Sequence, residues 1–231
     1  MDAWGLDVVV SASQKGLGAP PGLSVLVASQ RAIDLWETRM KRGAKSVSFY
    51  SSWEKCVHCN SFTGKLLITE SNSRWVPIMR AYDENKPAYF ATPAVTLVCA
   101  LHASLVEITR GPIPLATRLA MHIHASDLVK RAGERLGMKQ VPCEPAGRAH
   151  GMTALYVPEG VSAADVLGGV ARRGVVIAGG LVKEVKDRYI RVGHMGWSVV
   201  GDGGKDVSFV VRVLEEAVKE AVAKKRDMTR L

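Results

Sequence analysis

The sequence of 231 residues has few cysteines, few aromatic residues and no long apolar run. Its four cysteines do not have the spacing of a disulfide framework, which favours a reducing, intracellular compartment. No apolar run reaches the ~18 residues of a membrane-spanning helix, and the first residues lack the basic-then-apolar pattern of a secretory signal. We therefore expect an intracellular protein that does not interact with membranes.

Negative charge is in deficit, and the formal net charge is +9. Such a charge raises the possibility of a nucleic-acid partner, because basic surfaces bind phosphate backbones. The basic residues are scattered, however, and their two small clusters, within 39–45 and 224–226, do not alternate with aromatic residues as a base-stacking surface does. We expect either a solvated basic face or a general attraction for anionic metabolites, and no nucleic-acid partner.

One lysine, Lys15, lies in a turn rich in glycine and proline between two short apolar segments. Residues 7–10 and 23–27 are predicted to be strands, which places Lys15 at a strand-to-loop junction. A lysine amine that is partly desolvated there is a nucleophile toward carbonyl compounds, among them pyridoxal phosphate. The alternative is an ordinary exposed lysine in a turn.

The residues around Lys15 resemble a known family. Ser13-Gln-Lys15, followed by Ala19-Pro-Pro-Gly22, resembles the cofactor-lysine segment of the class V pyridoxal-phosphate aminotransferases, in the alanine–glyoxylate and serine–pyruvate branch. Further segments resemble family landmarks in the same order: Ser48-Phe-Tyr50, Lys86 to Pro93, Ile177-Ala-Gly-Gly-Leu181 and Tyr189-Ile-Arg-Val-Gly-His-Met-Gly196. The ordered matches span most of the chain.

The resemblance implies an α/β fold, namely the C-terminal part of a fold type I pyridoxal-phosphate transferase. Residues 1–111 would be a remnant of the large, parallel-sheet cofactor-binding domain, and residues 112–231 the small α+β domain. Apolar spacing and capping residues predict five helices and three further strands. The predicted helices are 29–42, 93–110, 115–136, 162–173 and one capped by Asp206, and the strands are 152–158, 175–178 and 189–192.

The resemblance also assigns site residues. Lys15 would bond covalently to pyridoxal 5′-phosphate and move the substrate α-proton, and Gln14 would hydrogen-bond the cofactor phosphate. Tyr89 and Thr92 match a pair that reaches the phosphate of the partner subunit across a dimer interface. Arg191, on an apolar strand, matches the arginine that binds the substrate carboxylate. Taken alone, Gln14 could be an amide that stabilises the turn, and Tyr89 an aromatic residue of an interface or core. Arg191 could belong to a structural ion pair.

The histidines and cysteines suggest no metal site. His122 and His124 would project to different faces of a helix, and we interpret both as structural or surface residues, like His58, His102 and His150. His194 adjoins the arginine motif, and its role is open. Cys56-Val-His-Cys59 could suggest zinc, but a second ligand pair at suitable spacing is missing, so we expect no metal.

The sequence departs from the family pattern twice. Lys15 lies close to Met1, whereas the family has a long upstream segment with the phosphate loop and the aspartate that pairs with the ring nitrogen. Residues 56–73 interrupt a segment that is nearly continuous in relatives, and our hypothesis is an insertion that derives from a translated intron.

The resemblance predicts a transaminase that moves an amino group from alanine or serine to glyoxylate or pyruvate, in a truncated form whose activity alone stays open. Its partners would be small amino and oxo acids, and the complete protein would be a homodimer. One alternative is a noncatalytic dimerising remnant, and another is a different class V enzyme such as a cysteine desulfurase-like lyase. Thr229-Arg-Leu231 departs from the Ser-Lys-Leu peroxisomal signal, so peroxisome, mitochondrion and cytosol stay open.

Overall fold

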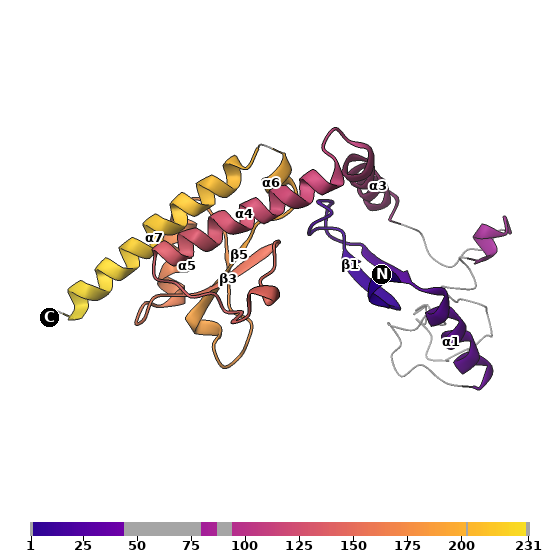
Figure 1. The fold of residues 1–231 in the computed structure, drawn as a ribbon, viewed down its shortest axis with the longest axis horizontal. Coiled ribbons are helices and arrows are strands. Elements are labelled where there is room, and N and C mark those ends of the chain that lie inside the picture. The colour runs from indigo at the N-terminus through magenta and orange to yellow at the C-terminus, as the bar shows by residue number, and fades with distance from the viewer. Residues whose placement is uncertain (1, 44–79, 87–93, 202, 230–231) are drawn as a thin grey trace, which may run out of the picture. The chain divides into compact units, whose positions relative to one another are not determined.

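The computed structural model describes residues 2–43, 80–86, 94–201 and 203–229 (Figure 1). It forms two compact units, one of residues 1–11 and 24–96 and the other of residues 12–23 and 97–231. Tyr89, Thr92 and the expected insertion at 56–73 lie outside the described residues. The expected domain boundary between residues 111 and 112 stays a prediction.

The first unit contains two paired strands and a helix. β1 (Val8–Ala12) and β2 (Ser24–Ala28) pair with each other, and the Ser29 N–H donates to the Asp7 carbonyl at 2.8 Å. α1 (Gln30–Lys41) begins where predicted, because the Ser29 side chain caps it by accepting from the Ala32 N–H at 3.1 Å.

Asp7 holds the start of this helix in place. Its carboxylate accepts from the Ser29 hydroxyl at 2.7 Å and forms an ion pair with Arg31 at 2.6 Å. The hydrogen bond from Arg31 is the main cause that lowers the pKa of Asp7, and the bond from Ser29 adds to it. Asp7 therefore has a structural role in this unit.

In the second unit, α3 (Val95–Arg110) and α4 (Leu115–Arg135) follow each other across a short turn. Arg118 is only 8% exposed, and its guanidinium contacts Glu107 Oε1 at 2.7 Å and the Ile113 carbonyl at 3.3 Å. A buried guanidinium is stabilised when its donors are paired in this way, so Arg118 fixes the turn at Gly111 and Pro112. Both helices lie close to the predicted ranges.

A three-stranded antiparallel sheet follows in the order β3-β5-β4. Its strands are β3 (Met152–Tyr156), β4 (Ala178–Gly179) and β5 (Tyr189–Gly193). The prediction of a strand over 175–178 was wrong in its bounds, since only Ala178 and Gly179 pair with β5. The Val175 N–H instead donates to the Val170 carbonyl at 3.2 Å, at the end of the preceding helix, and is not available to a sheet.

Three further helices complete this unit: α5 (Ala163–Arg172), α6 (Trp197–Val200) and α7 (Lys205–Thr229). Ser162 caps α5 as predicted, with its side chain accepting from the Ala164 N–H at 3.1 Å. Asp206 is not the cap of the last helix, because it lies inside the first turn of α7. The i to i+4 hydrogen bond from the Ser208 N–H ends on the Gly204 carbonyl, two residues earlier than expected.

The core of the second unit lies between its sheet and its helices. α7 packs on α5 and α4, and α4 packs on β3 (Figure 1). Buried apolar side chains of α7, among them Val207 and Val218, contribute to this core. Fully buried side chains include Val129, Leu155, Val166, Val170, Ile190, Val192 and Leu214.

At one point α5 and α7 approach so closely that a side chain in place of glycine would be crowded. A Cβ on Gly169 would lie 3.0 Å from the Cβ of Ala217.

No helix in the described part of the chain is both long and apolar enough to cross a membrane.

Candidate active site

The turn that carries Lys15 is anchored by Ser13, which is fully buried. The Ser13 hydroxyl donates to the Pro20 carbonyl at 2.6 Å and accepts from the Leu23 N–H at 3.4 Å. The anchored turn leaves the side chains of Gln14 and Lys15 exposed. Sequence reasoning gave Ser13 no role, although a serine beside a Pro-Pro-Gly turn is a common backbone-bonding residue.

The far side of this turn rests on two other segments of the same unit. The Ser104 hydroxyl of α3 donates to the Leu17 carbonyl. Gly196 lies against the turn so closely that a Cβ there would be 3.4 Å from the Lys15 carbonyl oxygen, and its φ of +69° also favours glycine. The Lys15 segment and the segment 189–196, far apart in sequence, therefore meet in space.

His122 fixes Gly196 from the side of α4. Its Nε2 accepts from the Gly196 N–H at 3.1 Å, and its Nδ1 lies 2.7 Å from the Arg118 carbonyl. A carbonyl only accepts, so Nδ1 carries the proton and the ring is the neutral Nδ1–H tautomer. The structural interpretation of His122 is therefore confirmed, and it includes support for the Lys15 turn.

Arg191 lies in the middle of β5, opposite Ala154 of β3 and Ala178 of β4. It is half-buried, and its Nε donates to the Gly179 carbonyl at 2.7 Å. No carboxylate of the described ranges forms an ion pair with it. The hydrogen bond orients the guanidinium and leaves its two terminal nitrogens for an anion.

The loop that precedes β5 is held by Tyr189. Its hydroxyl accepts from the Leu181 and Val182 N–H groups at 2.7 and 3.1 Å. These two backbone hydrogen bonds are the main causes that lower the pKa of Tyr189. They tie two of the family-like segments, 177–181 and 189–196, to each other.

His194 lies inside the unit, with 1% of its surface exposed. Its Nε2 is 2.8 Å from the Thr153 hydroxyl, and its buried Nδ1 has no hydrogen-bond partner within the described ranges. Burial is the main cause that lowers the pKa of His194. The His194 side chain is therefore buried in the unit beside Thr153 of β3, whereas the sequence had left its role open.

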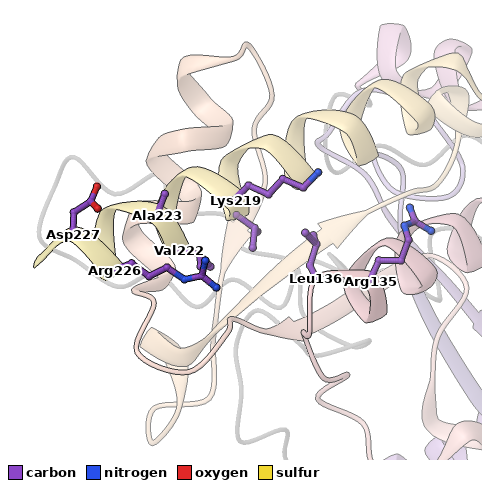
Figure 2. Close-up of a pocket in the computed structure, with 8 residues that line it drawn as sticks. Arg135, Leu136, Lys219, Val222, Ala223, Arg226 and Asp227 are labelled. Atoms are coloured by element: carbon purple, nitrogen blue, oxygen red, sulfur yellow. The ribbon is translucent and has the colours of Figure 1, made fainter. Parts of the chain in front are cut away.

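A groove at the end of the second unit is separate from these residues (Figure 2). It has a volume of about 540 Å³ and lies between the end of α4 and α7, with Leu136, Val222 and Ala223 in its floor and Arg135, Lys219 and Arg226 around them. It contains none of the predicted site residues. The described residues also hold no group of three or more potential metal ligands.

No family model matches the chain. Among curated proteins, the chain is 37% identical over 197 residues to alanine–glyoxylate aminotransferase 1 of Saccharomyces cerevisiae, covering 84% of this chain and 45% of that protein. It is 26% identical over 223 residues to the alanine–glyoxylate aminotransferase of Rattus norvegicus, covering 96% and 46%. The chain therefore spans about half the length of the curated relatives it matches.

Solved structures agree with this result. The chain matches an aspartate aminotransferase of subgroup IV from Thermus thermophilus with a TM-score of 0.69 and 28% identity, over 96% of this chain and 51% of that one. An alanine–glyoxylate aminotransferase from Nostoc sp. matches with a TM-score of 0.71 and 24% identity, over 94% and 49%, which shows the fold alone. The fold is that of the C-terminal part of a fold type I pyridoxal-phosphate enzyme. With the motifs around Lys15 and Arg191 in family order, the chain belongs to the class V pyridoxal-phosphate-dependent aminotransferases, in the alanine–glyoxylate branch.

Proposed function

We propose that this chain provides the lysine-bearing and carboxylate-binding half of an aminotransferase active site. The reaction would transfer an amino group between small amino and oxo acids, with alanine or serine as donor and glyoxylate or pyruvate as acceptor. The observation that carries the proposal is the contact between Gly196 and the Lys15 turn. It joins the segment of the expected cofactor lysine to the segment of the expected carboxylate-binding arginine within one compact unit.

The residues present fit pyridoxal phosphate. Lys15 offers an accessible primary amine on a turn held by the buried Ser13, and Gln14 offers an exposed amide next to it for the phosphate. When bound, the cofactor supplies an electron sink for the carbanion that deprotonation of an amino acid leaves. Lys15 would hold the cofactor and then carry the α-proton, since a neutral amine accepts a proton and an ammonium returns it.

Arg191 would bind the carboxylate of the substrate. Its Nε is engaged by the Gly179 carbonyl, so the planar guanidinium has one fixed orientation and presents its terminal nitrogens side by side. A fixed fork of this kind selects a planar, bidentate anion. This arrangement supports amino and oxo acids as substrates.

Three further parts of the proposal concern regions outside the described residues or beyond this chain. Tyr89 and Thr92 would donate hydroxyl hydrogen bonds to the cofactor phosphate of a partner subunit in a homodimer. Residues 56–73 would be an insertion into the first domain, 1–111. The compartment would be intracellular, in the peroxisome, the mitochondrion or the cytosol.

Chemical trapping tests the central claim. Pyridoxal phosphate is added to the purified chain, the mixture is reduced with borohydride, and the modified lysines are mapped by peptide mass spectrometry. We expect modification of Lys15 well above that of exposed lysines such as Lys139 and Lys183, and loss of the preferred label in Lys15→Arg. A label spread evenly over the exposed lysines would contradict the proposal. The exposed turn offers few contacts to the cofactor, so we expect binding to the 231-residue chain alone to be weak.

A further inference from the structure

A second polar cavity of about 300 Å³ lies between α4 and residues 140–150. Its lining includes Asp127, Lys130, Arg131 and Glu134 from the helix, and Arg148 and His150 from the facing segment. All of them belong to one compact unit, and none is part of the family motifs described above. The cavity thus has its own set of charged groups.

Lys130 is the most unusual of these groups, because it is 9% exposed. The burial lies in the apolar stem, and the ammonium reaches the open side of the cavity, as the heads of long charged side chains commonly do. Asp127 and Glu134 lie three positions before it and four after it on α4, yet neither forms an ion pair with it, nor does any other carboxylate of the described ranges. The Lys130 side chain is thus largely buried, while its ammonium lines the cavity and has no carboxylate partner among the described residues.

Arg148 brings a second cation to the same cavity with donors to spare. Its Nε is buried and has no hydrogen-bond partner among the described residues, while its Nη2 makes one long bond of 3.4 Å to the Cys143 carbonyl. Since buried donors are nearly always satisfied, an unpaired guanidinium N–H beside a buried lysine indicates a missing acceptor. Arginine and lysine together are the usual partners of carboxylate and phosphate oxygens.

We propose that this cavity binds a small oxyanion, the carboxylate or phosphate group of a small metabolite, between Lys130 and Arg148. The volume corresponds to roughly ten water molecules at about 30 Å³ each, which is enough for an anion with a short carbon chain. Asp127 and Glu134 on the lining would repel a second anionic group but accept hydrogen bonds from hydroxyl or ammonium groups. The site therefore favours a hydroxylated or aminated ligand that has one strongly anionic end.

Calorimetric titration of the 231-residue chain at constant ionic strength tests the proposal, with inorganic phosphate, sulfate and lactate as probes. We expect millimolar or tighter binding of at least one probe, weakened about tenfold or more in Lys130→Met and in Arg148→Met. Lys139→Met removes an exposed lysine next to the cavity and serves as the matched control, with unchanged affinity. Preference for phosphate and sulfate would identify a phosphate ligand, and preference for lactate a carboxylate.

Two further measurements separate the proposal from folding and from the aminotransferase function. Lys130→Met removes a charge that has no carboxylate partner among the described residues and keeps an apolar stem of similar length, so its ligand-free thermal unfolding should occur at the same temperature as that of the parent chain or higher. If Lys130→Met does not fold, Arg148→Met alone decides the question. Lys15→Ala should bind the probes normally, because it lies outside the cavity. Absence of binding of all three probes, or equal binding in the folded cavity variants, would overturn the proposal.

Discussion

The Nε2 atom of His122 accepts a hydrogen bond of 3.1 Å from the backbone N–H of Gly196, 74 residues away. The same glycine lies against the Lys15 turn, and the other ring nitrogen of His122 binds the Arg118 carbonyl. One imidazole therefore connects α4 to the segment that supports the expected cofactor lysine. Its role is to hold a turn in place, and it needs no contact with substrate to affect reactivity there.

We predict that His122→Ala destabilises the second unit by about 1–3 kcal/mol, because it leaves the buried Gly196 N–H without an acceptor. Urea unfolding measures the loss. The borohydride trapping of Lys15 should also become slower and less selective, since the turn loses a support. His124→Ala is the matched control, because His124 is exposed two positions along the same helix. Equal effects of the two substitutions would refute the role of His122.

The acid sensitivity of the fold should depend on His194. Burial lowers its pKa, so below about pH 6.5 the unfolded chain binds a proton that the folded chain does not. The free energy of unfolding should therefore fall as the pH drops from 6.5 toward the lower folded-state pKa, by at most about 1.4 kcal/mol per pH unit from this group. Well above pH 6.5 the imidazole is unprotonated in both states, and this group contributes no pH dependence.

His194→Gln tests this dependence, because an amide can still hydrogen-bond the Thr153 hydroxyl but does not titrate. Urea midpoints measured from about pH 7.5 to about 5.5 should show a shallower slope for this variant. The exposed His124→Gln should retain the slope of the parent chain. A slope that survives in His194→Gln would assign the acid sensitivity to other groups.

Local signals in the sequence gave most elements of the second unit correctly. Ser162 and the apolar spacing of α4 and α7 were sufficient because caps and helical periodicity depend on neighbouring residues. The bounds of β4 were predicted wrongly because the Val175 N–H donates to the Val170 carbonyl at the end of α5. Local strand propensity gives no sign of this competing hydrogen bond. The start of α7 was predicted two residues too late, at Asp206, because the Gly204 carbonyl already accepts a helical hydrogen bond from the Ser208 N–H.

The candidate site was only partly predictable. Lys15 and Arg191 were identified by motifs, whereas Ser13, His122 and the cavity around Lys130 were not. The contact between His122 and Gly196 depends on how α4 packs against a distant segment, and one sequence has no signal for such a pairing. The buried state of Lys130 is likewise a property of the packed unit, because lysine is usually exposed.

Two adjacent glycines on α5 should respond in opposite ways to the same substitution. A side chain on Gly169 would enter the contact with Ala217, where a Cβ alone would already be 3.0 Å away. Gly168 faces only the end of the Arg172 side chain, at 3.5 Å. We predict that Gly169→Leu lowers the free energy of unfolding by about 1–3 kcal/mol through overpacking, whereas Gly168→Leu is neutral or stabilising because leucine favours helix. Denaturant unfolding of both variants measures the difference, and equal stabilities would contradict the close approach.

Arg191 can be tested in a chimaera in which the N-terminal part of the yeast relative precedes this chain. If the chimaera transaminates, Arg191→Ala should raise the KM for alanine or serine strongly, because a lost bidentate contact to a carboxylate costs about 2–5 kcal/mol. The trapping of Lys15 should persist in this variant. Arg188→Ala, an exposed arginine three positions earlier that stacks on Tyr156, is the control. Unchanged kinetics in Arg191→Ala would remove Arg191 from the site.

Exposed apolar surface should control the association of the chain. In β1 and β2, Val10 and Leu26 are 64% and 48% exposed, and Val98 on α3 is 49% exposed, whereas the core of the second unit is closed. Such surfaces favour contact with other chains, at strand edges especially. We predict concentration-dependent association in sedimentation velocity, reduced by the triple substitution Val10→Thr, Leu26→Gln and Val98→Gln.

Residues 112–231 alone should sediment as a monomer and unfold cooperatively, since their sheet and helices contain most of the buried side chains. A monomeric, cooperatively unfolding full-length chain at micromolar concentration would contradict this prediction and favour a noncatalytic domain with its own closed core.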